Sequence, residues 1–288
     1  MSAVSRDDVL ARLAEGIRQL TTSRAWTAWL QTQSRFYRYS FGNVLLIASQ
    51  RPDATQVAGF HCWKSLGRSV RKGSRGIAIL APVVRRLAVR DEESDDVSVV
   101  AAAPSAFRVV YVFDVTDTEG RELPAVPCHP LRGDAPATLF ERLAAVGESR
   151  GFTVRLDPMR DSPANGDTAF GERRIRVRET LSPAQQVKTL AHELGHSLLH
   201  GDGTTERALA ELEAESVAFI VCQAVGIVSD EYSFGYVATW MGGDADAAEA
   251  ALRARAAGIT RAARTILDDV AEPGMEEPTK SRVGAHRD

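Results

Sequence analysis

The sequence predicts an α+β fold divided into two domains, on the strength of three observations. Strand-like apolar runs are concentrated between residues 59 and 113, whereas helical periodicity dominates from residue 183 onward. Residues 124–136 hold four prolines in thirteen positions, which is typical of a linker. A chain of 288 residues is long enough for two hydrophobic cores. We therefore expect a basic domain of mixed α/β structure over 1–130, a mostly helical domain with a small mixed sheet over 131–272, and a disordered tail over 273–288.

Helical and strand patterns follow one another in the first domain. Residues 7–33 have an amphipathic helical pattern with a possible break at 21–23, and a second, short helix is predicted over 43–49. Apolar runs over 77–84 and 109–113 predict strands, and we expect a loop over 91–105 between them.

In the second domain, strand patterns are limited to residues 152–156 and 173–178, with a turn at Asn165-Gly166 between them. The remaining pattern is helical. The predicted helices cover 138–148, 183–200, 205–225, 231–241 and 244–271.

The composition is that of an ordinary globular protein, with 44% hydrophobic and 25% charged residues. The cysteines, Cys62, Cys128 and Cys222, are odd in number and far apart, which argues against a disulfide framework and for a reducing compartment. No segment approaches the roughly 20 apolar residues that span a bilayer, and residues 1–13 lack the apolar region of a signal peptide. We expect a cytoplasmic protein without a membrane partner.

The charge is unevenly distributed along the chain. Residues 1–90 hold fifteen Arg or Lys against four Asp or Glu, a net charge of +11. The remaining 198 residues hold twenty against thirty-four, a net charge of −14. A basic N-terminal part suits a polyanionic partner, and arginine pairs with phosphate through two hydrogen bonds. A GC-rich genome would also enrich arginine.

The strongest chemical signal is the HExxH motif at residues 192–196, within the predicted helix 183–200. The start of this helix is well marked in the sequence. Ser182 is a good N-cap, Pro183 suits the first helical position, and Gln185 completes a capping box.

His192 and His196 are one helical turn apart, so both imidazoles can bind one zinc ion at about 2 Å. Glu193 then lies beside the metal, where its carboxylate can take a proton from water and pass it to a leaving amine. His200 is one turn further along, too far to bind the same ion, and we expect it to have a structural role. Two core or solvated histidines are the alternative explanation of the motif.

A third metal ligand must come from outside the motif. The metzincin pattern is excluded, because it requires Gly and His where this chain has Leu199 and Asp202. On the next predicted helix, Glu211 and Glu215 share a face with small alanines, which permit a close approach to the first helix. We predict Glu211 as the third ligand and Glu215 as a hydrogen-bond acceptor for a ligand histidine. Glu213 is predicted to be solvated, and the same pattern also fits ordinary surface glutamates.

Residues 192–200 and 211–218 together resemble the ImmA/IrrE-type zincin metallopeptidases, in which HELGH is followed by an E-x-E-A-x-x-x-A helix. In that family the first glutamate of the second helix is the third ligand, which agrees with Glu211. The resemblance also implies a mixed sheet whose edge strand lies over the zinc cleft, and residues 173–178 fit this strand.

Aromatic residues are interleaved with basic ones over residues 35–75. Rings stack on unpaired bases while guanidinium groups hold phosphates, so this composition is typical of single-strand binding. A solvated basic face with a few core aromatics would have the same composition. The predicted DNA contacts are Arg35, Tyr37, Arg38, Tyr39, Asn43, Trp63, Lys64, Arg68, Arg71, Lys72 and Arg75.

The N-terminal half resembles the single-stranded-DNA-binding domain of ArdC-type antirestriction proteins. The matching features are an aromatic at Tyr39, Gly42-Asn43 with Leu45-Leu46, Trp63-Lys64, and the V-x-K-G-x-x-G segment 70–76. An Asn-Pro-x-Thr-Gly segment that is frequent in the family is replaced here by residues 35–41. Residues 232–240 resemble the C-terminal end of the same proteins, and there Tyr236 is either a stabiliser of a developing oxyanion or a core aromatic.

Taken together, the two resemblances cover nearly the whole chain. They imply a zinc-dependent metallopeptidase-like protein that binds single-stranded DNA and protects mobile DNA from restriction, with a protein substrate as a possible second partner. Two alternatives stay open on the sequence. In the first, the chain is a non-catalytic DNA-binding shield with a structural zinc. In the second, it is an ImmA-like regulator that cleaves a repressor.

Overall fold

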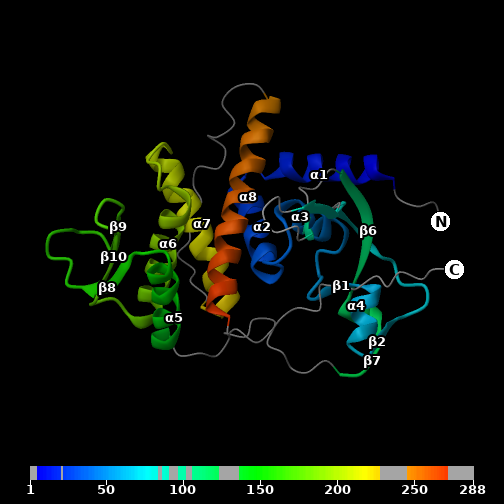
Figure 1. Ribbon diagram of the computed structural model, residues 1–288, viewed down its shortest axis with the longest axis horizontal. Helices are drawn as coiled ribbons and strands as arrows, with labels where there is room; N and C mark the ends of the chain where they lie inside the picture. Colours follow the sequence, from blue (N-terminus) through cyan, green and yellow to red (C-terminus); the bar gives the residue numbers. More distant parts are fainter. Residues whose placement is uncertain are drawn as a thin grey trace. The chain divides into compact units, whose positions relative to one another are not determined.

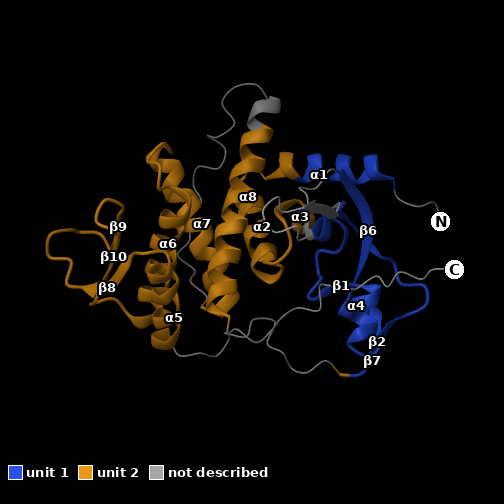
Figure 2. Ribbon diagram, viewed as in Figure 1, with its two compact units in different colours: residues 1–16, 45–121 blue, residues 17–44, 122–288 orange. Residues whose placement is uncertain are grey.

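The computed structural model describes residues 5–20, 22–83, 86–90, 97–101, 106–122, 136–227 and 245–271. The chain forms two compact units, coloured separately in Figure 2. Unit 1 consists of residues 1–16 and 45–121, and unit 2 of residues 17–44 and 122–288. Most of the predicted linker, the predicted helix 231–241 and the predicted tail lie outside the described residues.

Unit 1 contains a three-stranded antiparallel sheet with the strand order β1-β6-β3. Its strands are β1 (Val57–Gly59), β3 (Ile77–Val83) and β6 (Ala106–Asp114). Side chains alternate between the two faces of such a sheet. On one face Ile77, Ile79 and Val112 are at most 5% exposed, so the core of the unit lies on that side.

Shorter elements complete unit 1. They are helix α4 (Phe60–Ser65), the 3-10 helix η1 (Val115–Asp117), the paired strands β2 (Arg68–Val70) and β7 (Thr118–Gly120), and the paired strands β4 (Arg86–Arg90) and β5 (Val97–Ala101). None of these shorter elements was predicted as a helix or strand of its own. Helix α4 is too short to show a helical period, and β5 occupies part of the expected loop 91–105, because its valines pair with β4.

Helices α1 (Arg6–Gln19) and α3 (Phe41–Gln50) each belong partly to unit 1 and partly to unit 2. The predicted break in the first helical segment is confirmed, because α1 ends at Gln19 and α2 (Ser23–Arg35) begins with Thr22 as its N-cap.

A buried carboxylate, Asp114, fixes the end of β6 and is only 1% exposed. One of its oxygens accepts hydrogen bonds from the backbone N–H groups of Thr55 (2.8 Å) and Gln56 (3.2 Å). The other accepts from the backbone N–H (2.9 Å) and the hydroxyl (2.7 Å) of Thr116. Burial alone would raise the pKa of Asp114, but these hydrogen bonds outweigh it and lower the pKa.

Replacing Asp114 with alanine is therefore expected to lower the free energy of unfolding by about 2–4 kcal/mol, because several N–H groups lose their acceptor. The contribution of Asp114 is present above the pKa of an unfolded aspartate, about 3.9, and is lost as the pH falls through the lower folded pKa. Urea denaturation at neutral and acidic pH measures both effects. Asp53→Ala, at a side chain 77% exposed, is the control. A loss below about 0.5 kcal/mol, the range of ordinary surface substitutions, would contradict this role.

Unit 2 is mostly helical. Besides α2, its helices are α5 (Pro136–Ser149), α6 (Pro183–Leu199), α7 (Arg207–Val225) and α8 (Ala245–Val270). Helix α7 is the central one and contacts α6, α8 and α2 (Figure 1). In the described parts of the chain, no helix combines the length and apolar character that crossing a membrane requires.

Residues 17–44 pack with unit 2, although the expected boundary at residue 130 assigned them to the first domain. The reason is the apolar face of α2, where Trp26 and Leu30 are fully buried. The indole N–H of Trp26 donates to the hydroxyl of Ser216 on α7 at 3.1 Å. Helix α2 is thus part of the core around α7, far from its place in the sequence.

A mixed three-stranded sheet completes unit 2, with the strand order β8-β10-β9. Its strands are β8 (Thr153–Asp157), β9 (Gly166–Ala169) and β10 (Arg174–Arg178). Strand β10 is parallel to β8 and antiparallel to β9, and its Ile175 and Val177 are fully buried. The prediction that residues 173–178 form the edge strand over the cleft is wrong, because β10 is paired on both sides. Strands β8 and β9 are the two edges, and the edge beside the cleft is β9, whose Gly-Asp-Thr-Ala sequence has no strand pattern.

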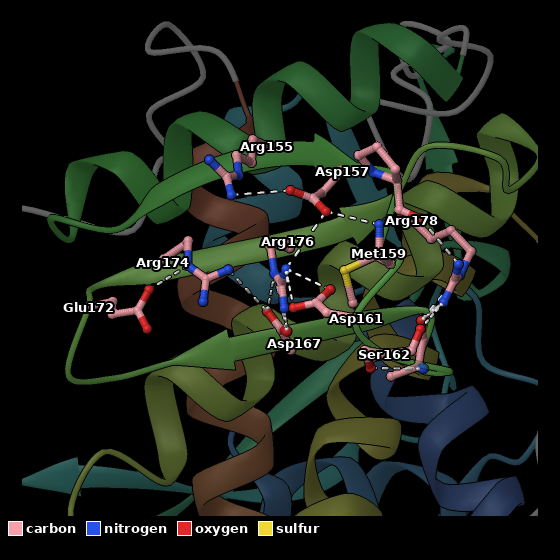
Figure 3. Close-up of polar contacts among 12 residues, drawn as sticks. Arg155, Asp157, Met159, Asp161, Ser162, Asp167, Glu172, Arg174, Arg176 and Arg178 are labelled. Carbon is pink, nitrogen blue, oxygen red and sulfur yellow. Dashed lines mark hydrogen bonds and ion pairs between the residues drawn. The ribbon is translucent and has the colours of Figure 1, made fainter.

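Arg176 of β10 organises the loop between β8 and β9 (Figure 3). Its guanidinium group, on a residue 9% exposed, binds the carboxylates of Asp161 and Asp167 and lies 3.7 Å from that of Asp157. Arg178 donates to three backbone carbonyls of the same loop. These contacts hold the loop, and with it the edge strand β9, against the rest of the sheet.

Candidate metal centre

Helix α6 presents the HExxH motif in a fixed direction because its start and its buried face are well defined. Ser182 is the N-cap and accepts a hydrogen bond from the backbone N–H of Gln185, and Pro183 occupies the first turn. Leu190 and Leu194 are fully buried, as the apolar stripe predicted. The burial of this stripe sets the rotation of the helix, and hence the direction of both histidines.

Helices α6 and α7 approach each other closely at Gly195. A Cβ atom at this position would lie 3.0 Å from the Cα atom of Ala214 and 3.3 Å from the Cβ atom of Val217. Ala214 and Ala218 are fully buried in the same contact. Any side chain larger than glycine would push α7 away, together with Glu211, which lies one turn before Ala214.

His192, His196 and Glu211 converge on one point between α6 and α7. The Nε2 atoms of the two histidines are 3.0 Å apart. The Oε2 atom of Glu211 lies 3.3 Å from Nε2 of His192 and 3.7 Å from Nε2 of His196. All three ligand atoms are within 4.8 Å of one another. Two imidazoles and a carboxylate with an open fourth side suit a divalent metal ion, and this is the donor set of catalytic zinc sites.

Glu215 contacts the outer nitrogen of His192, where the sequence predicted a hydrogen-bond acceptor. Its Oε2 atom is 3.1 Å from Nδ1 of His192, and its other oxygen lies 3.3 Å from the ammonium group of Lys188. Burial raises the pKa of Glu215, but His192 and Lys188 outweigh this effect and lower it. An acceptor at Nδ1 keeps the proton there and leaves Nε2 available to a metal.

A second chain of polar contacts starts at His196. Its Nδ1 atom is 3.0 Å from Nδ1 of His200, and Nε2 of His200 is 2.8 Å from a carboxylate oxygen of Glu213. Arg255 of α8 donates to the other oxygen of Glu213 at 3.0 Å. His200 and Glu213 are each 6% exposed. The prediction of a solvated Glu213 is therefore wrong, because α8 covers this face of α7.

Glu193 is buried beside the ligands, at 6% exposure. The hydroxyl of Thr168, on β9, donates to its Oε2 atom at 2.8 Å. A Cβ atom at Gly166 would lie 2.8 Å from its Oε1 atom, so only glycine leaves room for the carboxylate. Burial raises the pKa of Glu193, with His192 and the Thr168 hydrogen bond opposing it. The sequence analysis missed Thr168 and Gly166 because it did not predict β9.

A cleft of about 730 Å³ opens beside these residues. Its walls come from the β9 region, including Asn165 and Phe170, from α6, including Gln185, and from α7, including Arg207. The three ligands and Glu193 line the same cleft, which gives a substrate access to them. Tyr236, the predicted oxyanion stabiliser, lies outside the described residues.

Zinc binding at about pH 7.5 is expected to release about one proton, because the metal must displace the proton from His192. Burial lowers the pKa of His192, but its hydrogen bonds with Glu211 and Glu215 outweigh burial and raise the pKa to about 9. The release should therefore vanish as the pH rises above this value. Isothermal titration calorimetry in buffers with different ionisation enthalpies measures it, with His61→Gln, at an exposed histidine of unit 1, as the control. Zinc binding without proton release at pH 7.5 would show that His192 does not carry this proton in the metal-free protein.

The predicted DNA contacts of unit 1 include both exposed and structural residues. Lys64, Lys72 and Arg75 are exposed and have no partner among the described residues. Trp63 is 2% exposed and its indole N–H donates to the carbonyl of Phe113 at 2.9 Å. The prediction that Trp63 stacks on a base is wrong, because both of its faces are covered in the core.

Two further arginines of this set contact strand β7. Arg68 donates to the hydroxyl and the carbonyl of Thr118 and to the carbonyl of Arg121. Three of its donors therefore hold β2 and β7 together, and its predicted role at phosphates stays a prediction. Arg71 donates to the carbonyl of Thr118 at 3.2 Å, but its side chain is 56% exposed and can still reach a ligand.

The other predicted DNA contacts belong to unit 2. Tyr37 is only 9% exposed and lies beneath the guanidinium group of Arg38, so it is not a stacking surface. Arg38 lies 3.6 Å from the carboxylate of Asp268. Arg35 is exposed at the end of α2, whereas Tyr39 and Asn43 are half-buried.

Comparison with known proteins matches both parts of the chain. Residues 5–113 match the N-terminal domain of anti-restriction factor ArdC, and residues 148–223 match the IrrE N-terminal-like domain. An uncharacterised protein of Bacillus anthracis is 23% identical over 256 residues, covering 72% of this chain and 41% of that protein. The chain thus spans less than half the length of this relative.

Two solved structures of the antirestriction protein ArdC from plasmid R388 are similar to this chain. The Mn(II)-bound structure is 19% identical, with a TM-score of 0.52, covering 90% of this chain and 98% of that one. The metal-free structure is 20% identical, with a TM-score of 0.48, covering 80% of this chain and 84% of that one. At this identity the Mn(II)-bound structure shows the shared fold.

The fold and the site define a class of protein with a mixed α/β N-terminal domain and a mostly helical domain that holds an HExxH donor set. The chain has the architecture of the ArdC-type proteins, in which an ArdC N-terminal domain is followed by an IrrE-like domain. The predicted family and the predicted α+β two-domain fold class are thereby confirmed.

Proposed function

We propose that this chain is a zinc-dependent metallopeptidase-like protein that also binds single-stranded DNA and protects mobile DNA from restriction. The convergence of His192, His196 and Glu211 beside the buried Glu193 carries the proposal. Structural zinc sites are closed by four protein ligands, whereas the described residues bring three candidate ligands together beside an open cleft. A buried carboxylate with a raised pKa beside the ligands has a use in proton transfer and none in a structural site.

Each residue of the site has a defined task in peptide hydrolysis. When bound, zinc would supply a Lewis acid that polarises the substrate carbonyl and lowers the pKa of water. Glu193, held by Thr168, takes a proton from the attacking water and passes it to the leaving amine. Glu215 and His200 contact the Nδ1 atoms of His192 and His196 and so keep both Nε2 atoms directed at the metal.

The position of β9 supports a peptide as substrate. An extended peptide can add to the edge of a sheet through main-chain hydrogen bonds. Strand β9 is one of the two edge strands of its sheet and the one beside the site, because its Thr168 contacts Glu193. A peptide paired with β9 would therefore lie over the general base and the metal ligands.

Zinc fits the site better than manganese on the chemistry of its ligands. Two histidines and one glutamate are a common zinc set, whereas manganese prefers more oxygen ligands. The ArdC protein of plasmid R388 binds Mn(II) in its crystal structure, which supports a divalent metal in this fold. Metal analysis of the protein purified without added metal distinguishes the two ions.

The substitution Glu193→Gln tests whether catalysis is used. The variant is expected to keep zinc and DNA affinity but to lose protection of an unmodified plasmid that is transferred into a restricting host. Glu179→Gln, at an exposed glutamate before α6, is the matched control. Full protection by Glu193→Gln would instead favour a non-catalytic shield with a structural metal.

The DNA-binding half is tested by the salt dependence of the affinity for a single-stranded oligonucleotide. Each phosphate contact on a single strand contributes a slope of about −0.7 in log affinity against log salt. A basic surface that contacts several phosphates predicts a steep slope, and a flat response would exclude electrostatic DNA binding.

A further inference from the structure

The outer face of the sheet in unit 1 carries two exposed aromatic rings, Phe107 and Tyr111, and Tyr111 lies next to a basic turn. From this juxtaposition we propose that Phe107 and Tyr111 form the base-stacking surface for single-stranded nucleic acid, with Lys72 and Arg75 binding its phosphates. The proposal rests on the proposed DNA-binding function and assigns it to a surface.

Phe107 and Tyr111 lie on one face of β6, because residues four apart on a strand point to the same side. Phe107 is 48% exposed and Tyr111 is 40% exposed. Their partners on β3 are Pro82 and Ala78, which are too small to cover the rings. Large apolar side chains that gather on an exposed sheet face mark a binding surface more often than chance exposure.

The basic turn between β2 and β3 is directly joined to this aromatic face. Gly76, the last residue of the turn, has so little room that a Cβ atom would lie 3.0 Å from the Cβ atom of Tyr111. Lys72 and Arg75 precede it, are exposed, and have no partner among the described residues. Arg71, with its side chain 56% exposed, belongs to the same turn. Exposed cations beside flat rings are complementary to a strand of phosphates and bases.

The arrangement favours a single strand over a duplex and over a protein partner. The faces of bases are covered in a duplex, so rings can stack only on unpaired bases. Phe107 and Tyr111 are separated by about 13 Å along the strand, whereas stacked neighbouring bases are about 3.4 Å apart. An extended strand with separated bases fits this distance. A protein that covered an apolar face would leave the charges of the adjacent turn without a function.

Two of the aromatic residues predicted to contact DNA, Trp63 and Tyr37, are buried, unlike Phe107 and Tyr111. Trp63 is 2% exposed and Tyr37 is 9% exposed, so neither offers a free ring to a base. Phe107 and Tyr111 lie outside the basic segment of the sequence and reach the basic turn only through the pairing of β6 with β3.

The proposal is tested on the full chain with a fluorescently labelled 20-nucleotide oligothymidylate, whose affinity is measured by fluorescence anisotropy. Phe107→Ala and Tyr111→Ala are each expected to weaken binding roughly tenfold, and the double variant roughly 100-fold. Tyr111→Phe keeps the ring and should bind within about threefold of the parent. Leu156→Ala, at an exposed apolar residue on β8 of unit 2, should leave binding unchanged.

Salt titrations separate the two parts of the surface. Lys72→Ala and Arg75→Ala should each reduce the salt slope by about 0.7, whereas the aromatic variants should keep the slope of the parent. Each residue is 40–48% exposed, so the thermal unfolding midpoint should fall by only a few degrees in the aromatic variants.

The outcomes of this experiment are distinct. A parent chain that does not bind the oligonucleotide overturns the proposed DNA-binding function itself. A parent that binds, with a double alanine variant of equal affinity, overturns the surface alone. If sedimentation shows that the parent self-associates and the double variant does not, while DNA affinity is unchanged, the face joins copies of the chain and the proposal is also overturned.

Discussion

Replacing Glu211 with glutamine is expected to weaken zinc binding by more than about 100-fold, beyond the effect typical of residues that only orient a ligand. The carboxylate is one of the three candidate ligands, 3.3 Å and 3.7 Å from the two imidazole nitrogens, and its negative charge would stabilise a divalent cation. Glutamine keeps the size of the side chain but removes this charge. Competition with a chromophoric chelator measures the affinity.

Two comparisons show whether the effect belongs to the ligand position. Glu206→Gln changes an exposed glutamate at the start of the same helix and should leave zinc affinity unchanged. Glu215→Gln weakens the contact to Nδ1 of His192 and should cost about 10–100-fold. Parent-like zinc affinity in Glu211→Gln would show that the third ligand is a different residue.

The convergence of His192, His196 and Glu211 was predictable because it depends on local geometry. Two histidines four residues apart on one helix necessarily share a face, and the alanines beside Glu211 indicated a close contact between helices. The structure shows how close this contact is, since Gly195 lies against the backbone of Ala214. The sequence alone assigns this glycine no role, because nothing local shows which helix lies opposite.

Residues around the ligands were not predictable, because they come from elements distant in the sequence. Glu213 looks like a surface glutamate on its own helix and is buried only because α8 supplies Arg255. Thr168 reaches Glu193 from β9, a strand that exists because it pairs with β10 and not because of its own sequence. Tertiary contacts decided both cases.

The aromatic residues of unit 1 show the same limit. Composition indicated that rings and arginines are concentrated near the N-terminus, but not which rings are covered. Trp63 is a core residue because its indole N–H binds a carbonyl of β6. Tyr111 is exposed because small residues, Ala78 and Gly76, lie next to it. Burial of a ring depends on the size of its neighbours across the sheet, which sequence spacing does not give.

Replacing Glu213 with alanine is expected to lower the free energy of unfolding by about 2–3 kcal/mol, since His200 and Arg255 lose their common acceptor. This expected loss of stability is smaller than for a fully buried ion pair, because the side chain of Arg255 is 33% exposed. Urea denaturation of the metal-free protein measures it. Glu249→Ala removes a more exposed ion pair on α8 and should cost less than about 0.5 kcal/mol.

The same substitution should weaken zinc binding roughly tenfold, because His200 without Glu213 no longer holds the outer nitrogen of His196 in one orientation. Glu213→Gln keeps an acceptor for His200 and should restore most of the zinc affinity, while stability recovers only in part because the charge facing Arg255 is gone. Loss of stability with parent-like zinc affinity would mean that the chain of contacts from His196 to Arg255 supports the fold alone. If Glu213→Ala loses both stability and zinc affinity, and Glu213→Gln restores the zinc affinity, then Arg255 of α8 helps to orient a metal ligand on α6.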